Sequence, residues 1–174
     1  MAADSIQIVE YEQQWPEMFA AEREFLLSIV GKYVCGTIEH VGSTAVRGLS
    51  AKPIVDIMLG VQSLAGSKGA ITLLVAKGYC YYPYKVDVMH WFCKPTPEIR
   101  THHLHLVPFQ SDLWFERLAF RDCLRKNVDL ATEYASLKHK LARQFKDERE
   151  RYTQGKGPFI QDVLASLAGK TLIP

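Results

Sequence analysis

A chain of 174 residues is long enough for one hydrophobic core and too short for two ordinary domains, so we expect a single domain over residues 1–174. Hydrophobic residues make up 48% of it and charged residues 23%, as in globular proteins, and no stretch has the roughly 18 apolar residues of a membrane span. Four scattered cysteines without a C-x-x-C pair argue against a zinc site or disulfide framework, and the absence of a signal-peptide pattern predicts a cytoplasmic protein.

Two kinds of hydrophobic pattern, helical and strand-like, occur along residues 1–110. Apolar residues spaced three and four apart predict helices, and short apolar runs bounded by Gly or Pro predict strands. In chain order the predicted elements are a helix over Trp15–Val30, strands over 35–42 and 52–61, a helix in the second half of 64–77, and strands over 86–93 and 101–108.

Residues 111–174 have only helical patterns. Apolar positions repeat over 112–127 and 130–145, and residues 155–169 predict a last short helix. A sheet region followed by a helical region predicts an α+β domain. Residues 115–156 contain eleven Lys and Arg against seven Asp and Glu, which favours an anionic ligand near these helices or simply solvated helix faces.

A Gly-Ser turn follows the first predicted strand. Gly42 allows the backbone to approach a ligand closely, and Ser43 with Thr44 can cap a helix that starts there. The free N–H groups and the positive dipole end of such a helix would form a phosphate site.

Asp56 lies thirteen residues after Ser43, inside an otherwise apolar run. A carboxylate in such a run is costly unless something pairs with it. Mg²⁺ or Mn²⁺ carried on the phosphates of a nucleotide would be a suitable partner, since Mg²⁺ prefers one or two carboxylates plus phosphate oxygens and water. If the two strands are adjacent, the turn and Asp56 form one site for phosphate and metal.

Several segments, in this order, resemble the GrpB family, which belongs to the nucleotidyltransferase superfamily: HVGSTAVRGLSAKPIVDIML, RTHHLHLV, FRDCLR, YASLKHKLA and YTQGKGPFI. The resemblance extends over residues 8–168. It implies a nucleotidyltransferase-like fold, in which a small mixed β-sheet holds the Gly-Ser turn and the acidic strand, and helices complete the cleft.

Two residues depart from the pattern that the resemblance implies. The superfamily's acidic strand has a second carboxylate two residues after the first, so that both lie on one face and hold two metal ions. Met58 occupies that place here, and a thioether is a poor ligand for Mg²⁺. Arg47 stands where the family has proline, and it either adds a phosphate contact or lies in solvent.

His103 and His105 project from one face of their predicted strand. The resemblance places a third acid on a later strand of the same sheet, and these histidines are its best counterpart. Imidazole can bind a softer divalent metal, act as a general base toward an acceptor hydroxyl, or bind phosphate when protonated. Alternating histidines on a strand are also often ordinary hydrogen-bonded residues.

Basic residues near the strand starts and in the later helices complete the candidate site. Lys52 and Arg100 could each bind a phosphate or lie in solvent. Arg121, Lys138 and Lys156 could line the acceptor side of the cleft or form surface salt bridges.

Two functions follow as hypotheses. In the first, a nucleotidyltransferase binds a nucleoside triphosphate through Gly42 and Ser43, holds a divalent metal on Asp56, and transfers a nucleotidyl group to a small-molecule acceptor. In the second, which Met58 favours, a non-catalytic module binds a nucleotide or phosphorylated metabolite. A nucleic-acid binder is the weakest alternative, because the net charge is only +2 and no basic run contains interleaved aromatic residues.

Overall fold

Residues 5–170 are described by the computed structural model, which contains a five-stranded mixed sheet with the strand order β1-β2-β5-β4-β3. Strands β2 and β5 are parallel, and the other neighbouring pairs are antiparallel. The strands are β1 Val34–Val41, β2 Val55–Val61, β3 Cys80–Tyr82, β4 His90–Pro95 and β5 Arg100–Pro108. The helices are α1 Trp15–Val30, α2 Lys68–Val75, α3 Asp112–Lys126, α4 Val128–Gln144, α5 Arg149–Gly155 and α6 Gly157–Lys170.

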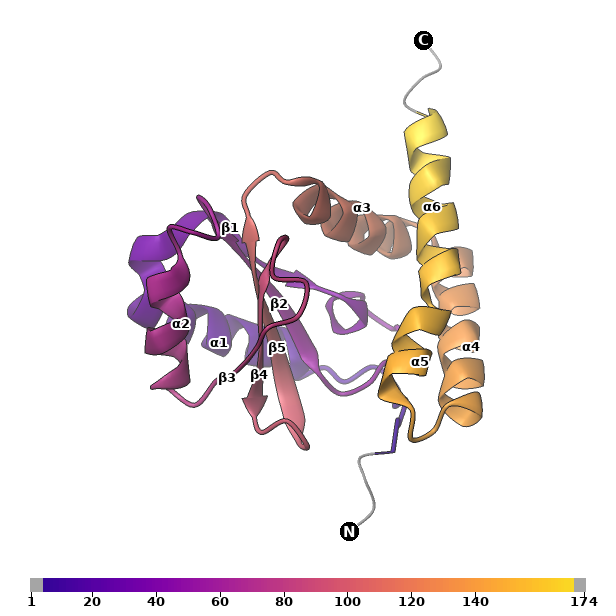
Figure 1. Ribbon diagram of the computed structural model, residues 1–174. Coiled ribbons are helices and arrows are strands. Elements are labelled where there is room, and N and C mark those ends of the chain that lie inside the picture. The colour runs from indigo at the N-terminus through magenta and orange to yellow at the C-terminus, as the bar shows by residue number, and fades with distance from the viewer. Residues whose placement is uncertain (1–4, 171–174) are drawn as a thin grey trace.

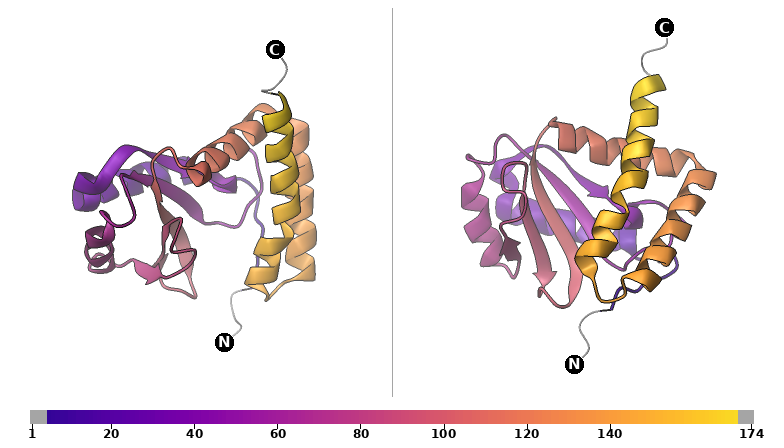
Figure 2. Two further views of the ribbon diagram at one scale, coloured as in Figure 1. Left: turned by 45° about the horizontal axis from the view of Figure 1, so that its top comes forward. Right: turned by 45° about the vertical axis from the view of Figure 1, so that its right-hand side comes forward.

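Helices flank the sheet in two groups (Figure 1). Helices α1 and α2 lie together on one side, and α3 leads from the end of β5 into α4, α5 and α6 on the other, as the two turned views in Figure 2 also show. The predicted α+β class, the mixed sheet with flanking helices and the helical C-terminal part are confirmed. No helix in residues 5–170 is long and apolar enough to cross a membrane.

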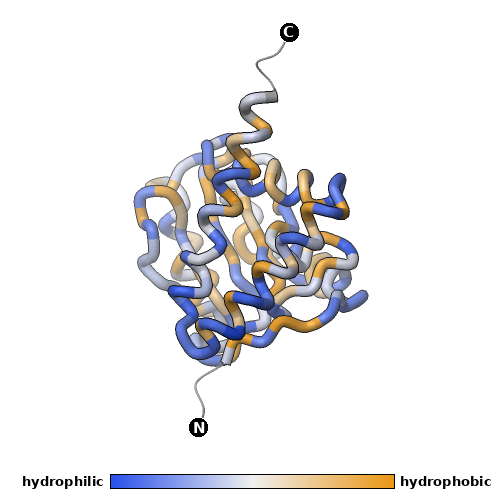
Figure 3. The backbone as a smooth tube through the Cα atoms, turned by 90° about the vertical axis from the view of Figure 1, so that its right-hand side faces the viewer, coloured by the Kyte–Doolittle hydropathy of each residue, from blue (hydrophilic) through white to orange (hydrophobic). Residues whose placement is uncertain are grey.

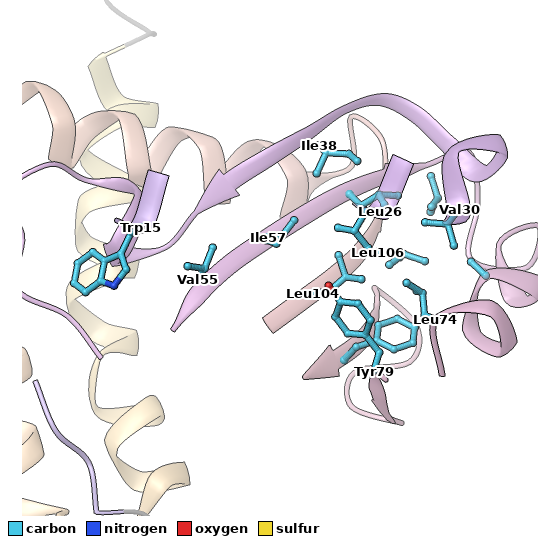
Figure 4. Packing of buried hydrophobic residues seen from close by; sticks show 14 of the residues in the cluster. Trp15, Leu26, Val30, Ile38, Val55, Ile57, Leu74, Tyr79, Leu104 and Leu106 are labelled. Carbon is cyan, nitrogen blue, oxygen red and sulfur yellow. The ribbon is translucent and has the colours of Figure 1, made fainter. Parts of the chain in front are cut away.

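The main hydrophobic core lies between the sheet and helices α1 and α2 (Figure 4). Every second residue of β2 belongs to this core, because successive side chains of a strand point to opposite faces. Its labelled members in the figure include Leu26, Val30, Leu74, Leu104 and Leu106. The intervening residues of β2 therefore face the helical C-terminal part.

A separate apolar cluster joins the helical part to the loop between β1 and β2. Val46 and Leu49 from the loop are buried with Leu124 of α3 and Tyr134 of α4. Figure 3 shows apolar and polar segments alternating along the C-terminal helices, which is the pattern of helices with one buried face. This cluster positions the helical part relative to β2.

A buried lysine forms a second connection between these parts. Lys138 of α4 is 2% exposed, and its Nζ atom donates a hydrogen bond to the carbonyl oxygen of Ser50. The same ammonium group lies 4.9 Å from the centre of the Tyr134 ring. Burial, together with a smaller effect of the charge of Lys156, lowers the pKa of Lys138 from an ordinary 10.5 to about 7.

Some predicted elements differ from the structure. The strand predicted over 86–93 begins only at His90, because a turn with Lys85 at a φ of +50° occupies the preceding residues and leaves Val86 and Val88 exposed. Strand β3 and helix α5, three and seven residues long, were not predicted. Both are too short for a clear hydrophobic period.

The buried position of Lys138 predicts how stability depends on pH. Below pH 7 this lysine is protonated in both the folded and the unfolded chain; between pH 7 and 10 the folded chain releases the proton while the unfolded chain keeps it. Higher pH therefore favours the folded state. The free energy of unfolding of the wild type minus that of Lys138→Met should increase by about 1.4 kcal/mol per pH unit in this window, measured by urea titration.

The matched control is Lys140→Met, on an exposed position of the same helix. The free energy of unfolding of Lys140→Met, plotted against pH, should run parallel to that of the wild type. If the curve of Lys138→Met also runs parallel, Lys138 is protonated in the folded protein and its ammonium group is not isolated from water.

Candidate functional site

Asp56 lies on the sheet face opposite the main core, beside two histidines of the neighbouring strand. Parallel pairing aligns Asp56 of β2 with His103 of β5, and Met58 with His105. His103 Nδ1 donates a hydrogen bond of 2.9 Å to Asp56 Oδ1, and His105 Nε2 lies 3.8 Å from the same oxygen. The structure thus brings together the three residues predicted as the catalytic group.

This group consists of an ionised carboxylate beside a neutral imidazole. Burial raises the pKa of Asp56, but the hydrogen bond from His103 and the proximity of His105 outweigh it and hold the pKa well below its usual range. Burial lowers the pKa of His105 to about 3, and the charge of Arg117 acts in the same direction. At neutral pH His105 can therefore exchange hydrogen bonds but supplies no positive charge.

The Gly-Ser turn contacts the carboxylate directly. Val41, the last residue of β1, pairs with Asp56, which places Gly42 against the Asp56 side chain. A Cβ atom at position 42 would lie 2.5 Å from Asp56 Oδ2, and the φ of Gly42 is +71°. Both the close approach and the left-handed backbone require glycine.

The prediction that a helix begins at Ser43 and presents its dipole to a phosphate is wrong. Ser43–Ala45 form a single 3₁₀ turn, and Val46 is already extended. The chain leaves the turn because Val46 and Leu49 are buried against the helical part. No side chain caps this turn, and three residues are too few to present a helix dipole to a phosphate.

The two hydroxyl groups of the turn are used within the protein. Thr44 is 1% exposed, and its Oγ1 atom lies 3.0 Å from His40 Nε2 and donates a 3.2 Å hydrogen bond to the Ile54 carbonyl. Thr44 was predicted to bind the cofactor, but it does not face the site. Ser43 is half-buried, and its hydroxyl lies near Tyr134, where it acts on the pKa of that phenol in the direction opposite to burial.

Two cations of the helical part act on Asp56. Arg117 lies on α3, and Lys156 lies at the junction of α5 and α6. Burial lowers the pKa of both side chains, while the Asp56 carboxylate raises both. The ammonium of Lys156 also lies 4.6 Å from the centre of the buried Tyr152 ring. We call Asp56, His103, His105, Arg117 and Lys156 the Asp56 site.

Arg117 was not among the predicted site residues. A sequence signal exists, because Arg117 and Arg121 follow Leu113 at helical intervals of four residues and so interrupt the buried stripe of α3 with charge. Arg121 is committed elsewhere: its Nη1 atom donates to Glu39 Oε2 at 2.7 Å.

Three buried nitrogen atoms of the Asp56 site have no hydrogen-bond partner within residues 5–170. They are His103 Nε2, His105 Nε2 and Arg117 Nε. Buried polar groups in proteins are nearly always hydrogen-bonded, so a cluster of exceptions indicates a position that a ligand completes. At least the guanidinium nitrogen is an obligatory donor, which oxygen atoms would satisfy.

Lys52 and Arg100 lie in a pocket of about 350 Å³ beside this site, together with Arg149 of α5. Lys52 is half-buried, and its ammonium lies 5.6 Å from the centre of the Tyr152 ring. Burial and, to a smaller extent, the charges of Arg149 and other cations together lower the pKa of Lys52 to about 8. Lys52 thus lies between the pocket and the Asp56 site.

The residue two positions after Asp56 supplies no second carboxylate. Met58 is fully buried in an apolar cluster with Val41 and Trp114. A packed apolar side chain therefore fills the place where a second carboxylate would lie. Glu39, which pairs with Met58, is held by Arg121 and accepts a 2.8 Å hydrogen bond from Thr37.

The donor set does not fit a resident magnesium or manganese ion. No group of three or more His, Cys, Asp or Glu side chains between residues 5 and 170 is arranged to hold a metal. One Asp56 oxygen is engaged by His103, and the charges of Arg117 and Lys156 oppose a free cation. Mg²⁺ and Mn²⁺ prefer several oxygen ligands, of which this site offers one carboxylate.

Comparison with known proteins places the chain in a family. Residues 5–166 match the GrpB protein family. A UPF0157 protein of Pseudomonas aeruginosa is 38% identical over 97% of this chain and 69% of its own length, and the glutamate-rich protein GrpB of Alkalihalophilus pseudofirmus is 36% identical over 90% and 92%. A crystal structure of the conserved protein GrpB from Enterococcus faecalis has a TM-score of 0.84 and 31% identity, covering 96% of this chain and all of that one. The chain belongs to the GrpB family.

Proposed function

We propose that this protein binds a phosphorylated small molecule, a nucleoside phosphate in the first instance, at the Asp56 site. The observation that carries the proposal is an excess of positive charge. Arg117 responds to the carboxylates of Asp56 and Glu116, Lys156 responds to that of Asp56, and Lys52 adds a third cation close enough for its pKa to respond to both Asp56 and Lys156.

An oxyanion would relieve the cost of this arrangement. Burial lowers the pKa of Arg117, Lys156 and Lys52, which means that the charged form of each is disfavoured where it stands. A phosphate would supply negative charge and would also accept a hydrogen bond from the buried Arg117 Nε atom. The resemblance to nucleotidyltransferases supports a nucleotide as the carrier of that phosphate.

Nucleotidyl transfer is the second candidate, and the hydrogen bond between His103 and Asp56 favours it. An imidazole that donates one N–H to a carboxylate can take the proton of an acceptor hydroxyl on its other nitrogen, here His103 Nε2, while the hydroxyl oxygen attacks the α-phosphorus and pyrophosphate leaves. Mg²⁺ or Mn²⁺ would then arrive with the phosphates rather than reside in the free protein. Because Met58 fills the place of the second carboxylate, binding without transfer is the first proposal.

The charge argument predicts the effect of removing one cation. Arg117→Gln should weaken the binding of ATP and of pyrophosphate at least tenfold, measured by calorimetry in 50 mM salt, since a charge-assisted contact in a partly buried site contributes more than 1.4 kcal/mol. Arg143→Gln, on an exposed position of α4, is the control and should bind like the wild type. Equal affinities for all three proteins would show that phosphate does not bind at this site.

A second prediction concerns the uptake of protons when phosphate binds. In the protein without ligand the pKa of Lys52 is about 8, so at pH 8 about half of the molecules carry a proton on the Lys52 side chain. A bound phosphate raises that pKa, and binding at pH 8 should therefore take up close to half a proton. The charges that act on Lys52 are those of Arg149, Lys156, Asp56 and Arg100.

Calorimetry in buffers of different ionisation enthalpy measures this uptake. The difference in proton uptake between the wild type and Lys52→Met separates the contribution of Lys52 from that of Lys156. An uptake that the substitution leaves unchanged would remove Lys52 from the binding site.

Asp56→Asn separates the two candidate functions. If the protein binds phosphate through its cations, removing the Asp56 carboxylate should strengthen ATP binding in EDTA by several-fold. If a metal-nucleotide is the ligand, the same substitution should abolish any gain in affinity from Mg²⁺ and any release of pyrophosphate. We expect the first result. Asp162→Asn, on an exposed position of α6, controls for the general change in charge.

A further inference from the structure

The pocket that holds Lys52, Arg100 and Arg149 lies at the end of the parallel strand pair. Arg100, the first residue of β5, precedes His103 by three residues, and Lys52 lies three residues before β2 begins. At about 3.3 Å per strand residue, the backbone of Arg100 lies roughly 10 Å along the sheet from that of His103. The pocket has a volume of about 350 Å³, and no residue of the Asp56 site is among those that line it.

Three cationic side chains from different elements line this pocket. Arg100 Nε and Arg149 Nη1 both donate hydrogen bonds to the Pro97 carbonyl, at 2.8 and 3.3 Å, which fixes the two guanidinium groups close together. The Arg100 guanidinium also lies 5.2 Å from the centre of the Trp91 ring. Guanidinium groups held in place by a carbonyl and a ring are well suited to recognise phosphate oxygens.

Lys52 connects the pocket to the Asp56 site. Its ammonium and that of Lys156 lie 5.6 and 4.6 Å from the centre of one buried ring, that of Tyr152. The charges of Arg149 and Arg100 on one side and of Lys156 and Asp56 on the other act on Lys52. Charge interactions therefore link the cations in a series: Arg117 acts on Lys156, and both Lys156 and Arg149 act on Lys52.

We propose that this pocket is a second anion subsite, so that the ligand of the Asp56 site is a polyphosphate or bisphosphate rather than a monophosphate. The inference rests on the proposed function, because it assumes that a first phosphate binds at the Asp56 site. It adds the class of ligand: two or more anionic groups joined by a linker that extends past Lys52.

Binding of orthophosphate, pyrophosphate and tripolyphosphate tests this, with the full chain and calorimetry as the readout. In the wild type, affinity should rise with chain length, by at least tenfold from pyrophosphate to tripolyphosphate. Arg149→Gln should lose that gain and keep the affinity for orthophosphate, whereas Arg117→Gln should weaken all three. Arg151→Gln, on an exposed position of the same helix α5, should behave like the wild type.

The outcomes separate the two proposals. If orthophosphate binds but affinity does not increase with chain length, or Arg149→Gln leaves the increase intact, the second subsite is wrong and the proposed function stands. If none of the three phosphates binds to the wild type, both proposals fail. Arg149→Lys should restore part of the gain, and equal melting temperatures without ligand should exclude misfolding of Arg149→Gln as the cause of the loss.

Discussion

Parallel pairing of β2 with β5 is the constraint on which the rest of the candidate site depends. The register places Asp56 opposite His103 and, two residues further, Met58 opposite His105. Because side chains alternate between faces, the same two strands present a continuous apolar surface to α1 and α2 and a polar group to the helical part. One residue of slippage would exchange these two surfaces, so the core and the candidate site specify the same register.

The helical part brings positive charge to this polar face, and an apolar cluster, the buried Lys138 and the ion pair between Arg121 and Glu39 hold it there. The cluster of Val46 and Leu49 with the helices is apolar, and Lys138 reaches a backbone carbonyl rather than an acid. Burying more cations than carboxylates costs folding free energy. Proteins commonly retain such costs at functional sites, where a ligand offsets them.

Much of the sheet and of its acidic centre followed from the sequence, and the rest required information that a sequence does not contain. The helix Trp15–Val30 is long and periodic, and Asp56, His103 and His105 lie on strands whose alternation fixes the face of each side chain. The helix expected at Ser43 failed because burial of two later loop residues overrides local capping preferences. Arg117 reaches the site only through the packing of α3 on the sheet, which no local pattern specifies.

Gly42 and Asp56 are coupled by more than proximity. A methyl group at position 42 would meet the Asp56 carboxylate at 2.5 Å, so part of the damage caused by Gly42→Ala would be a displacement of Asp56. With alanine also at position 56 the contacts with the carboxyl group disappear, leaving a 3.0 Å approach to the Cβ atom of residue 56 and the strain of the left-handed backbone. The effects of the two substitutions on stability should therefore not add. Replacement of Gly42 therefore costs less stability once Asp56 has already been replaced. The order in which these two positions change during evolution consequently matters.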